Sequence, residues 1–241
     1  MNLFQRFWQK RRLPCAAVIV AAGSGERMHG VDKILSPVGG KPVIVHTIAA
    51  FEASGAIDEI VVVARREQVE TIKVLIYENG FRKVKDVVAG GATRVESVHC
   101  GLHAMSKDIE LAAIQDGARP LVTPEIIERA VMQAVKCHAA APAIPMKDTV
   151  KEVDELGRVV STPDRETLRA VQTPLVFQKD LLLAAWERAR KEGKTYTDDC
   201  GAMEALGISV YLIEGSEENL KITTPLDLYL AEHILAGREQ S

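Results

Sequence analysis

Charged side chains and glycines follow the first apolar run of the chain in a pattern that suits phosphate binding. Residues 21–28 (AAGSGERM) contain Arg27, and Lys33 follows six positions after it. Glycines directly after a buried strand allow backbone N–H groups to turn toward a bound anion. The segment lacks the third glycine of a dinucleotide fingerprint and the GK[ST] ending of a P-loop. It therefore favours a triphosphate site of another class, with two solvated surface cations as the alternative.

Two later segments also follow predicted strands, and the first of them repeats the pattern of glycines. Residues 90–97 (GGATRVES) follow a predicted strand and begin a helix, whose first N–H groups we expect to be free for a ligand, with Ser97 placed to hydrogen-bond to a base edge. Residues 115–120 (QDGARP) place Asp116 at the end of a strand. Magnesium takes few protein ligands together with phosphate oxygens and water, so this carboxylate suits it. The alternatives are a plain turn around Ser97 and an Asx-turn or capping role for Asp116.

Four candidate residues lie in the second half of the chain. Lys221 stands in an extended segment before the last predicted helix, Arg165 follows a predicted hairpin, and the QTP and TDD segments contribute the hydroxyls of Thr173 and Thr197. None of the six histidines belongs to a motif that demands a catalytic role. The sequence therefore contains no recognisable arrangement of a nucleophile, a histidine and an acid.

Short β-rich runs alternate with amphipathic stretches, which predicts parallel βαβ units and an α/β fold with a doubly wound sheet. Strands are predicted at 16–21, 59–64, 85–89, 111–115 and 209–213. Helices are predicted at 42–53, 68–78, 94–105, 124–136, 179–191, 197–206 and from 225 to about 235. In such a sheet, ligands bind at the carboxyl ends of the strands, where the glycine segments are expected.

Residues 147–163 break this alternation. Polar and apolar residues alternate on both sides of a polar turn at 154–157, which predicts a β-hairpin. A lone hairpin is marginally stable in water, so we expect this arm to pack against a second subunit. The alternative is a solvated flap on its own subunit. We assign residues 1–14 to an N-terminal extension and residues 15–241 to a single domain that carries the arm.

Composition limits the possible partners. The formal net charge of -3 gives no general basic field for nucleic acid. The four cysteines are scattered without a CxxC pair, which is typical of a reduced, cytoplasmic protein. The longest apolar run is too short to span a bilayer. We therefore expect a cytoplasmic protein without a membrane span, whose anionic ligands are held by local basic residues.

Taken in order, the segments AAGSGERM, GGKP, GGATRVES, QDGARP, DTV, PDR, QTP, TDD and NLKIT closely resemble the 2-C-methyl-D-erythritol 4-phosphate cytidylyltransferases of the non-mevalonate isoprenoid pathway. The resemblance covers residues 16–235. It implies a Rossmann-like nucleotidyltransferase fold and a homodimer that exchanges the β-arm. It also implies transfer of CMP from CTP to a polyol phosphate, 2-C-methyl-D-erythritol 4-phosphate, with Mg²⁺ or another divalent ion as cofactor and pyrophosphate as the second product.

The resemblance, and not the spacing, assigns roles to individual residues. Arg27 and Lys33 correspond to the pair that stabilises the triphosphate and the transition state, and Lys221 to a further active-site cation. Asp116 corresponds to the metal ligand. The groups that correspond to the cytidine site are Ala21, Ala22, Gly23, Gly91 and Ser97. Those that correspond to the acceptor site, with arm residues reaching across the dimer, are Thr149, Arg165, Thr173 and Thr197.

Other functions remain open at this stage. A ribitol-5-phosphate cytidylyltransferase shares the fold and the chemistry, and a sugar-1-phosphate uridylyl- or guanylyltransferase would share the first loop. A non-catalytic nucleotide-binding protein on the same fold would be expected to lose the cations or Asp116, which are all present. A dehydrogenase is disfavoured because an acidic residue is missing at 64–66, where the next strand ends.

Overall fold

A computed structural model of the 241-residue chain describes residues 13–23 and 32–239. At its centre lie three parallel strands, β1 (Cys15–Val20), β4 (Glu59–Ala64) and β6 (Leu111–Asp116). In register, Val18 of β1 stands opposite Val61 and Ile114. These strands are almost continuously apolar and buried, as expected for strands that are covered on both faces.

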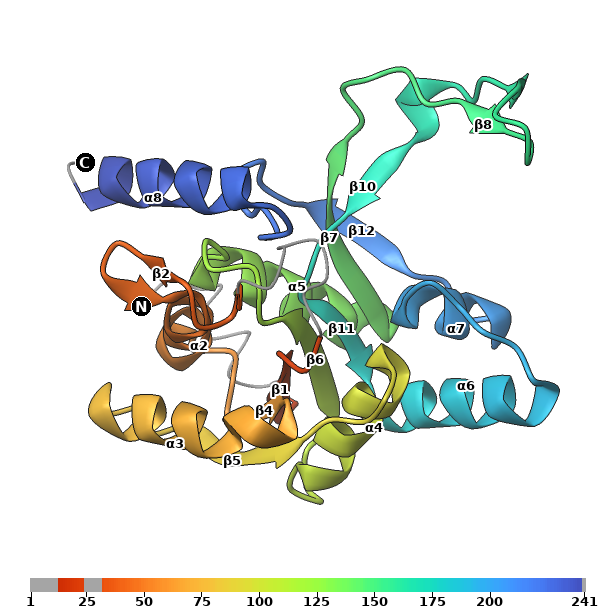
Figure 1. Ribbon diagram of the computed structural model, residues 1–241. Coiled ribbons are helices and arrows are strands. Elements are labelled where there is room, and N and C mark those ends of the chain that lie inside the picture. The colour runs from red at the N-terminus through yellow and green to blue at the C-terminus, as the bar shows by residue number, and fades with distance from the viewer. Residues whose placement is uncertain (1–12, 24–31, 240–241) are drawn as a thin grey trace, which may run out of the picture.

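Eight strands form one mixed sheet in the order β10-β7-β11-β6-β1-β4-β5, with β12 paired to β7 (Figure 1). The outer strands are β5 (Val84–Ala89), β7 (Ala139–Pro145), β10 (Arg169–Val171), β11 (Leu175–Gln178) and β12 (Tyr211–Glu214). The strands β10 and β11 run antiparallel to their neighbours, whereas β1, β4, β5 and β6 are parallel. The carboxyl ends of β1, β5 and β6 therefore meet at one edge.

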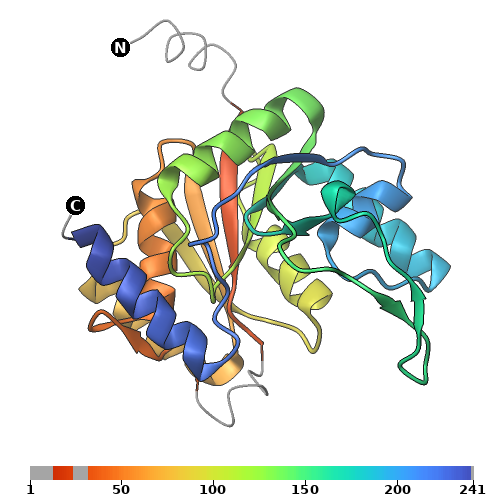
Figure 2. The same cartoon turned by 90° about the horizontal axis from the view of Figure 1, so that it is seen from above.

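Helices cover both faces of this sheet, which confirms the predicted doubly wound α/β class (Figure 2). One apolar cluster lies under α2 (Val43–Ala53), α3 (Val69–Glu78), α5 (Pro124–Cys137) and α8 (Pro225–Glu239). The other lies under α4 (Arg94–Ala104), α6 (Lys179–Glu192) and α7 (Asp199–Ala205). Within the described residues, no helix combines the length and apolar content that a bilayer crossing requires.

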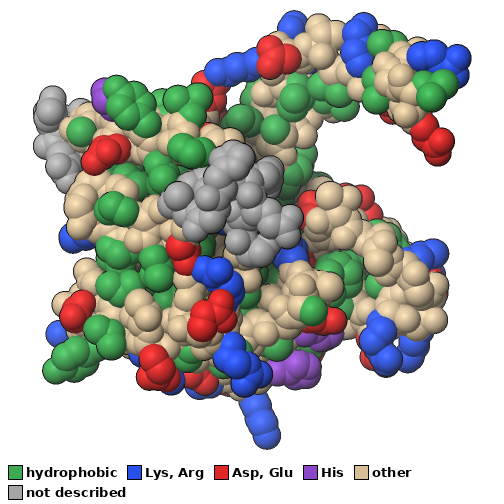
Figure 3. All heavy atoms as spheres, in the orientation of Figure 1, with side chains coloured by type: hydrophobic (Ala, Val, Ile, Leu, Met, Phe, Trp, Pro, Cys, Tyr) green, Lys and Arg blue, Asp and Glu red, His purple; other side chains and the backbone are tan. Residues whose placement is uncertain are grey.

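The predicted hairpin is present and stands away from the body (Figures 1 and 3). Its antiparallel strands are β8 (Glu152–Val153) and β9 (Val159–Ser161), between β7 and β10. The Asp154 carboxylate accepts hydrogen bonds from the N–H groups of Leu156 (3.0 Å) and Arg158 (2.9 Å), and Gly157 supplies the positive φ of 76° that the turn needs. Several apolar side chains of this arm are exposed to solvent: Val153, Leu156, Val159 and Val160.

Three sheet strands were absent from the sequence prediction. The sequence of β7, AAAPAIP, is rich in alanine and proline, which are depleted in strands, yet it is buried between neighbours. The strands β10 and β11 are only three and four residues long. The helix predicted at 197–206 begins at Asp199, because the carboxylate of Asp198 caps it by accepting from the N–H of Gly201 at 2.9 Å.

Candidate active site

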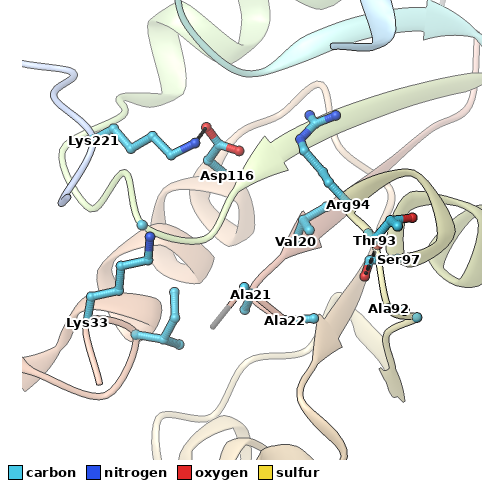
Figure 4. Close-up of a pocket in the computed structure, with 14 residues that line it drawn as sticks. Val20, Ala21, Ala22, Lys33, Ala92, Thr93, Arg94, Ser97, Asp116 and Lys221 are labelled. Carbon is cyan, nitrogen blue, oxygen red and sulfur yellow. Dashed lines mark hydrogen bonds and ion pairs between the residues drawn. The ribbon is translucent and has the colours of Figure 1, made fainter. Parts of the chain in front are cut away.

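A cavity of about 320 Å³ lies at the carboxyl edge of the sheet (Figure 4). This volume is near the lower end of the range for small-molecule sites, roughly 300–1,000 Å³. We refer to it as the cleft. The residues that line it are Val20, Ala21, Ala22, Gly23, Lys33, Ile34, Gly91, Ala92, Thr93, Arg94, Ser97, Asp116, Ala118 and Lys221.

Two glycine turns form one wall of the cleft and touch each other. The turn after β1 is tied to β4 by the N–H of Ala21, which donates to the carbonyl of Val63 at 2.7 Å. The turn after β5 approaches it so closely that a Cβ on Gly90 would lie 2.6 Å from both Ala22 Cβ and Ser97 Oγ. Gly90 is therefore required for space, because no larger residue lets the two turns meet.

The start of α4 differs from our expectation of free N–H groups. Thr93 and Glu96 form a capping box: Thr93 Oγ1 accepts from the N–H of Glu96 at 3.1 Å, and Glu96 Oε2 accepts from the N–H groups of Thr93 (3.2 Å) and Ala92 (2.6 Å). These three N–H groups are thus used within the protein. Ser97 is buried, and its hydroxyl donates to the carbonyl of Thr93 at 2.9 Å, which leaves its oxygen as an acceptor.

The opposite wall carries an ion pair between a nearly buried carboxylate and a partly exposed lysine. Lys221 Nζ lies 2.8 Å from Asp116 Oδ2, and Arg119 Nε lies 3.6 Å from the same oxygen. Only 13% of the Asp116 side chain is exposed. Burial raises the pKa of the Asp116 carboxyl, but Lys221 and Arg119 outweigh burial and hold that pKa below its usual value. The carboxylate is therefore ionised at neutral pH.

The segment that carries Lys221 is anchored to the loop after β6. The N–H of Ile222 donates to the carbonyl of Ala118 at 2.8 Å, and Arg119 donates to the carbonyl of Asn219 at 2.5 Å. Asn219 is fully buried and donates to the carbonyl of Thr173 at 3.0 Å. These bonds fix Lys221 opposite Asp116, although 105 residues separate the two in sequence, from 116 to 221.

Most of the residues predicted from the first three segments line the cleft, and so does Lys221. Those that line it are Ala21, Ala22, Gly23, Lys33, Gly91, Ser97, Asp116 and Lys221. Thr173 lies beside them, because its hydroxyl oxygen accepts from the backbone N–H of Asp116 at 3.1 Å. Arg27 lies outside the described residues.

Three predicted acceptor residues lie elsewhere on the subunit. Thr149 and Arg165 stand at the base of the arm, where Arg165 donates to the carbonyl of Lys147 at 3.0 Å. Thr197 lines a second, more open hollow between α4 and α6. None of these three side chains belongs to the wall of the cleft in its own subunit.

Sequence reasoning missed two cations, Arg94 and Arg119. Both stand within quoted segments, GGATRVES and QDGARP, but the sequence alone does not show which way a side chain points. Arg94 lines the cleft and also binds Asp199, at 2.7 Å between Nη1 and Oδ2. The TDD segment offered one signal for Arg94, because an aspartate that becomes buried on folding needs a positively charged partner. No spacing links that segment to residue 94.

The donor set of the cleft fits magnesium better than a transition metal. In the part of the chain that the structure describes, no group of three or more His, Cys, Asp and Glu side chains could hold a metal ion. Asp116 is the single carboxylate among the described lining residues. Magnesium is typically bound through one or two carboxylates and completes its shell with substrate phosphates and water.

Comparisons with known proteins identify relatives over nearly the whole chain. A sequence model of the family IspD, 2-C-methyl-D-erythritol 4-phosphate cytidylyltransferase, matches residues 15–237. The enzyme of that name from Alkaliphilus oremlandii is 43% identical over 93% of this chain and 96% of its own. The one from Halalkalibacterium halodurans is 45% identical over 93% and 98%.

Solved structures with similar names have a similar fold. The crystal structure of 4-diphosphocytidyl-2C-methyl-D-erythritol synthase from Anaerococcus prevotii has a TM-score of 0.83 at 31% identity, and covers 93% of this chain and 96% of that one. The cytidylyltransferase from Thermus thermophilus has a TM-score of 0.73 at 32% identity, covering 93% and 100%. The chain therefore belongs to the 2-C-methyl-D-erythritol 4-phosphate cytidylyltransferase family.

Proposed function

We propose that this enzyme transfers CMP from CTP to 2-C-methyl-D-erythritol 4-phosphate within the cleft, and so forms 4-diphosphocytidyl-2-C-methyl-D-erythritol and pyrophosphate. The reaction is that of its family. One observation carries its assignment to this cleft: Lys33, Asp116 and Lys221 come from distant segments and line one hollow bounded by glycine turns.

The bond changes need no general base. A phosphate oxygen of the acceptor attacks the α-phosphorus of CTP, the bond to the bridging oxygen of the β-phosphate breaks, and pyrophosphate leaves with that electron pair. The acceptor phosphate is already largely ionised at neutral pH, since its second pKa is about 6. The barrier is therefore electrostatic, because two anions must meet and charge builds on the leaving group.

Fixed cations lower this barrier. We assign Lys33, together with Arg27, to the triphosphate and the transition state, and Lys221 to the same group of catalytic cations. Asp116 would hold Mg²⁺ or another divalent ion, which supplies positive charge to the phosphate oxygens when bound. The ion pair between Asp116 and Lys221 also orients the lysine before substrate arrives.

The nucleoside and the acceptor are assigned to different walls. The cytidine site comprises the turn residues Ala21, Ala22, Gly23, Gly91 and Ser97. Thr173 and Thr197 are assigned to the acceptor from the same subunit, and Thr149 and Arg165 from the partner's arm. In support, the last two stand outside the cleft of their own subunit, at the base of an arm with exposed apolar side chains.

We accordingly propose a homodimer in which each arm, residues 147–163, covers the neighbouring cleft. Residues 15–241 would form the single catalytic domain, and residues 1–14 an extension outside it. None of the four cysteines, Cys15, Cys100, Cys137 and Cys200, forms a disulfide within the described residues, which supports the reducing cytoplasm as the site of the reaction.

A pyrophosphate-release assay tests this function. The purified enzyme is given CTP and Mg²⁺ with 2-C-methyl-D-erythritol 4-phosphate, ribitol 5-phosphate or glycerol 3-phosphate in parallel, and then UTP, GTP or ATP in place of CTP. We expect the highest kcat/KM with CTP and the methylerythritol phosphate. Faster turnover of ribitol 5-phosphate would instead assign the alternative acceptor, and absence of release with every acceptor would reject the function.

A further inference from the structure

The cleft contains a cation that the chemistry above does not use. Arg94 is the first residue of α4, and its side chain extends from the glycine-turn wall toward the end of the cleft where Asp116 lies (Figure 4). The side chain is 31% exposed, and Arg94 lines both the cleft and the second hollow. Burial lowers the pKa of Arg94, but the nearby carboxylates outweigh burial and raise that pKa above its usual value. Asp199 contributes most to the rise, and Asp116 contributes next.

Behind Arg94 lies a completely buried carboxylate. Asp199 Oδ2 accepts from Arg94 Nη1 at 2.7 Å, and Asp199 Oδ1 accepts from the indole N–H of Trp186 at 3.1 Å. The Asp199 side chain has no solvent exposure. A buried charge is costly unless it is paired and hydrogen-bonded, so this carboxylate strongly favours one position of the guanidinium.

An arginine that only neutralised Asp199 would have no need to face the cleft. A guanidinium has five N–H donors, and the described bond to Asp199 uses the Nη1 group. The remaining fork suits two oxygens of a phosphate, the group that both substrates carry. Arg94 thus combines a buried anchor on one side with an exposed donor edge on the other.

We propose that Arg94 binds a phosphate group of CTP or of the acceptor, and that Asp199 is a positioning residue that holds the Arg94 guanidinium toward the cleft. This inference rests on the proposed function of the cleft. It gives the TDD segment a role through its second aspartate, in addition to the role assigned to Thr197.

The test is a double-mutant cycle read by steady-state kinetics. The variants are Arg94→Gln, Asp199→Asn and the two combined, with KM for CTP, KM for the acceptor and kcat measured for each. We expect Arg94→Gln to raise one KM about tenfold or more, as for loss of a charged hydrogen bond. Asp199→Asn should raise the same KM by a smaller factor, and the double variant should match Arg94→Gln, because Asp199 acts through Arg94.

Two further variants separate positioning from general stability. Arg94→Lys keeps the charge without the planar fork and should restore part of the lost KM. Arg82→Gln removes an exposed cation that lines neither the cleft nor the second hollow, and should leave both KM values within twofold. Urea unfolding of each variant shows that the assays are made on folded protein.

The inference is overturned if Arg94→Gln leaves both KM values and kcat within threefold of wild type. It is also overturned if the Asp199→Asn effect multiplies with that of Arg94→Gln or falls on a different parameter. Failure of the proposed function is distinguishable, because wild-type enzyme would then release no pyrophosphate. An active wild type that is slowed by Lys33→Ala but not affected by Arg94→Gln rejects this inference alone.

Discussion

The cleft and the arm differ in the bonds that hold them. The cleft is formed by turns that follow buried strands, and its polar side chains are held by bonds from distant segments, such as Asp116 with Lys221 and Thr173. The arm is held mainly by local bonds, such as those of Asp154 to its own turn, and its apolar side chains face solvent. The cleft is thus organised within one subunit, whereas the arm has exposed apolar surface that a partner would bury.

The cleft and the arm therefore place different requirements on the protein. A preorganised cleft requires charge at fixed positions, so a single lost cation weakens transition-state binding. An arm without its own core requires a partner, so a single added charge on its apolar surface disturbs assembly. Substitutions in the two regions should therefore change different observables.

The largest effect is expected at Lys33. Lys33→Ala removes a cation that is proposed to bind the triphosphate, and we expect kcat to fall about a hundredfold or more, as when one well-placed donor is lost. Arg27→Ala is expected to have an effect of the same size. Lys73→Ala, on the exposed surface of α3, is the matched control and should leave kcat within twofold. Near-normal kcat in Lys33→Ala would remove this residue from the catalytic role.

The arm is tested by a charge on its apolar surface. Val160 is 67% exposed, and Val160→Lys places an ammonium where the partner is proposed to pack. Sedimentation velocity should show a dimer for the wild type and a shift to monomer for the variant, with a raised KM for the acceptor. Tyr77→Lys replaces an apolar side chain that is 87% exposed on α3 and should remain dimeric. A wild-type monomer would contradict the proposed assembly.

Glycine substitutions sharpen the comparison further. Gly90→Ala introduces a Cβ that collides with Ala22 and Ser97, so we expect a loss of about 1–3 kcal/mol of stability and a raised KM for CTP.

Gly157→Ala meets no atom within 4 Å but must adopt a φ of 76°. It should cost about 1–2 kcal/mol while KM for CTP stays unchanged. Urea unfolding and steady-state kinetics measure both; an unchanged KM in Gly90→Ala would show that the two turns need not touch.

The smallest effect concerns the segment that carries Lys221. One oxygen of Asp227 accepts from the N–H groups of Thr223 and Thr224, both at 2.7 Å, and so caps α8. Burial raises the pKa of Asp227, but these bonds outweigh it and lower that pKa below 3.8. Asp227→Asn should lower the free energy of unfolding by about 1 kcal/mol at pH 7.

The sign of the pH dependence follows from that lowered pKa. The contribution of the carboxylate is present above its unfolded-state pKa and is lost as the pH falls through the lower folded-state value. Wild type and Asp227→Asn should therefore converge in unfolding free energy below about pH 3.8. Asp148→Asn, at an exposed position on the arm, is the control and should differ from wild type by less than about 0.5 kcal/mol throughout. A constant gap for Asp227→Asn across pH would contradict the carboxylate's role.

Much of the fold was predictable because its central strands are short apolar runs between clear helix signals. The strand at Glu59–Ala64 was predicted to the residue, and the hairpin was predicted from its alternation and polar turn. The strand β7 was not predicted, because its alanines and prolines favour no strand and only the neighbouring strands and helices make it one.

The candidate site was predictable where a residue's place follows from a strand end, as for Asp116 and Gly23. Contacts across the sequence were not predictable from residue types, as for Arg94 with Asp199 or Lys221 with Asp116. The resemblance to a known family supplied residue roles without that geometry.

The most direct test of the account is a single-turnover measurement of CMP transfer by Lys221→Ala, with enzyme in excess over α-³²P-labelled CTP and a saturating acceptor concentration. Rapid quenching isolates the chemical step from substrate binding and product release. If Lys221 and its neighbours stabilise charge at the scissile phosphorus, this step should be slower by about a hundredfold or more. A transfer rate within threefold of wild type would contradict the claim that the cations of the cleft perform the chemistry.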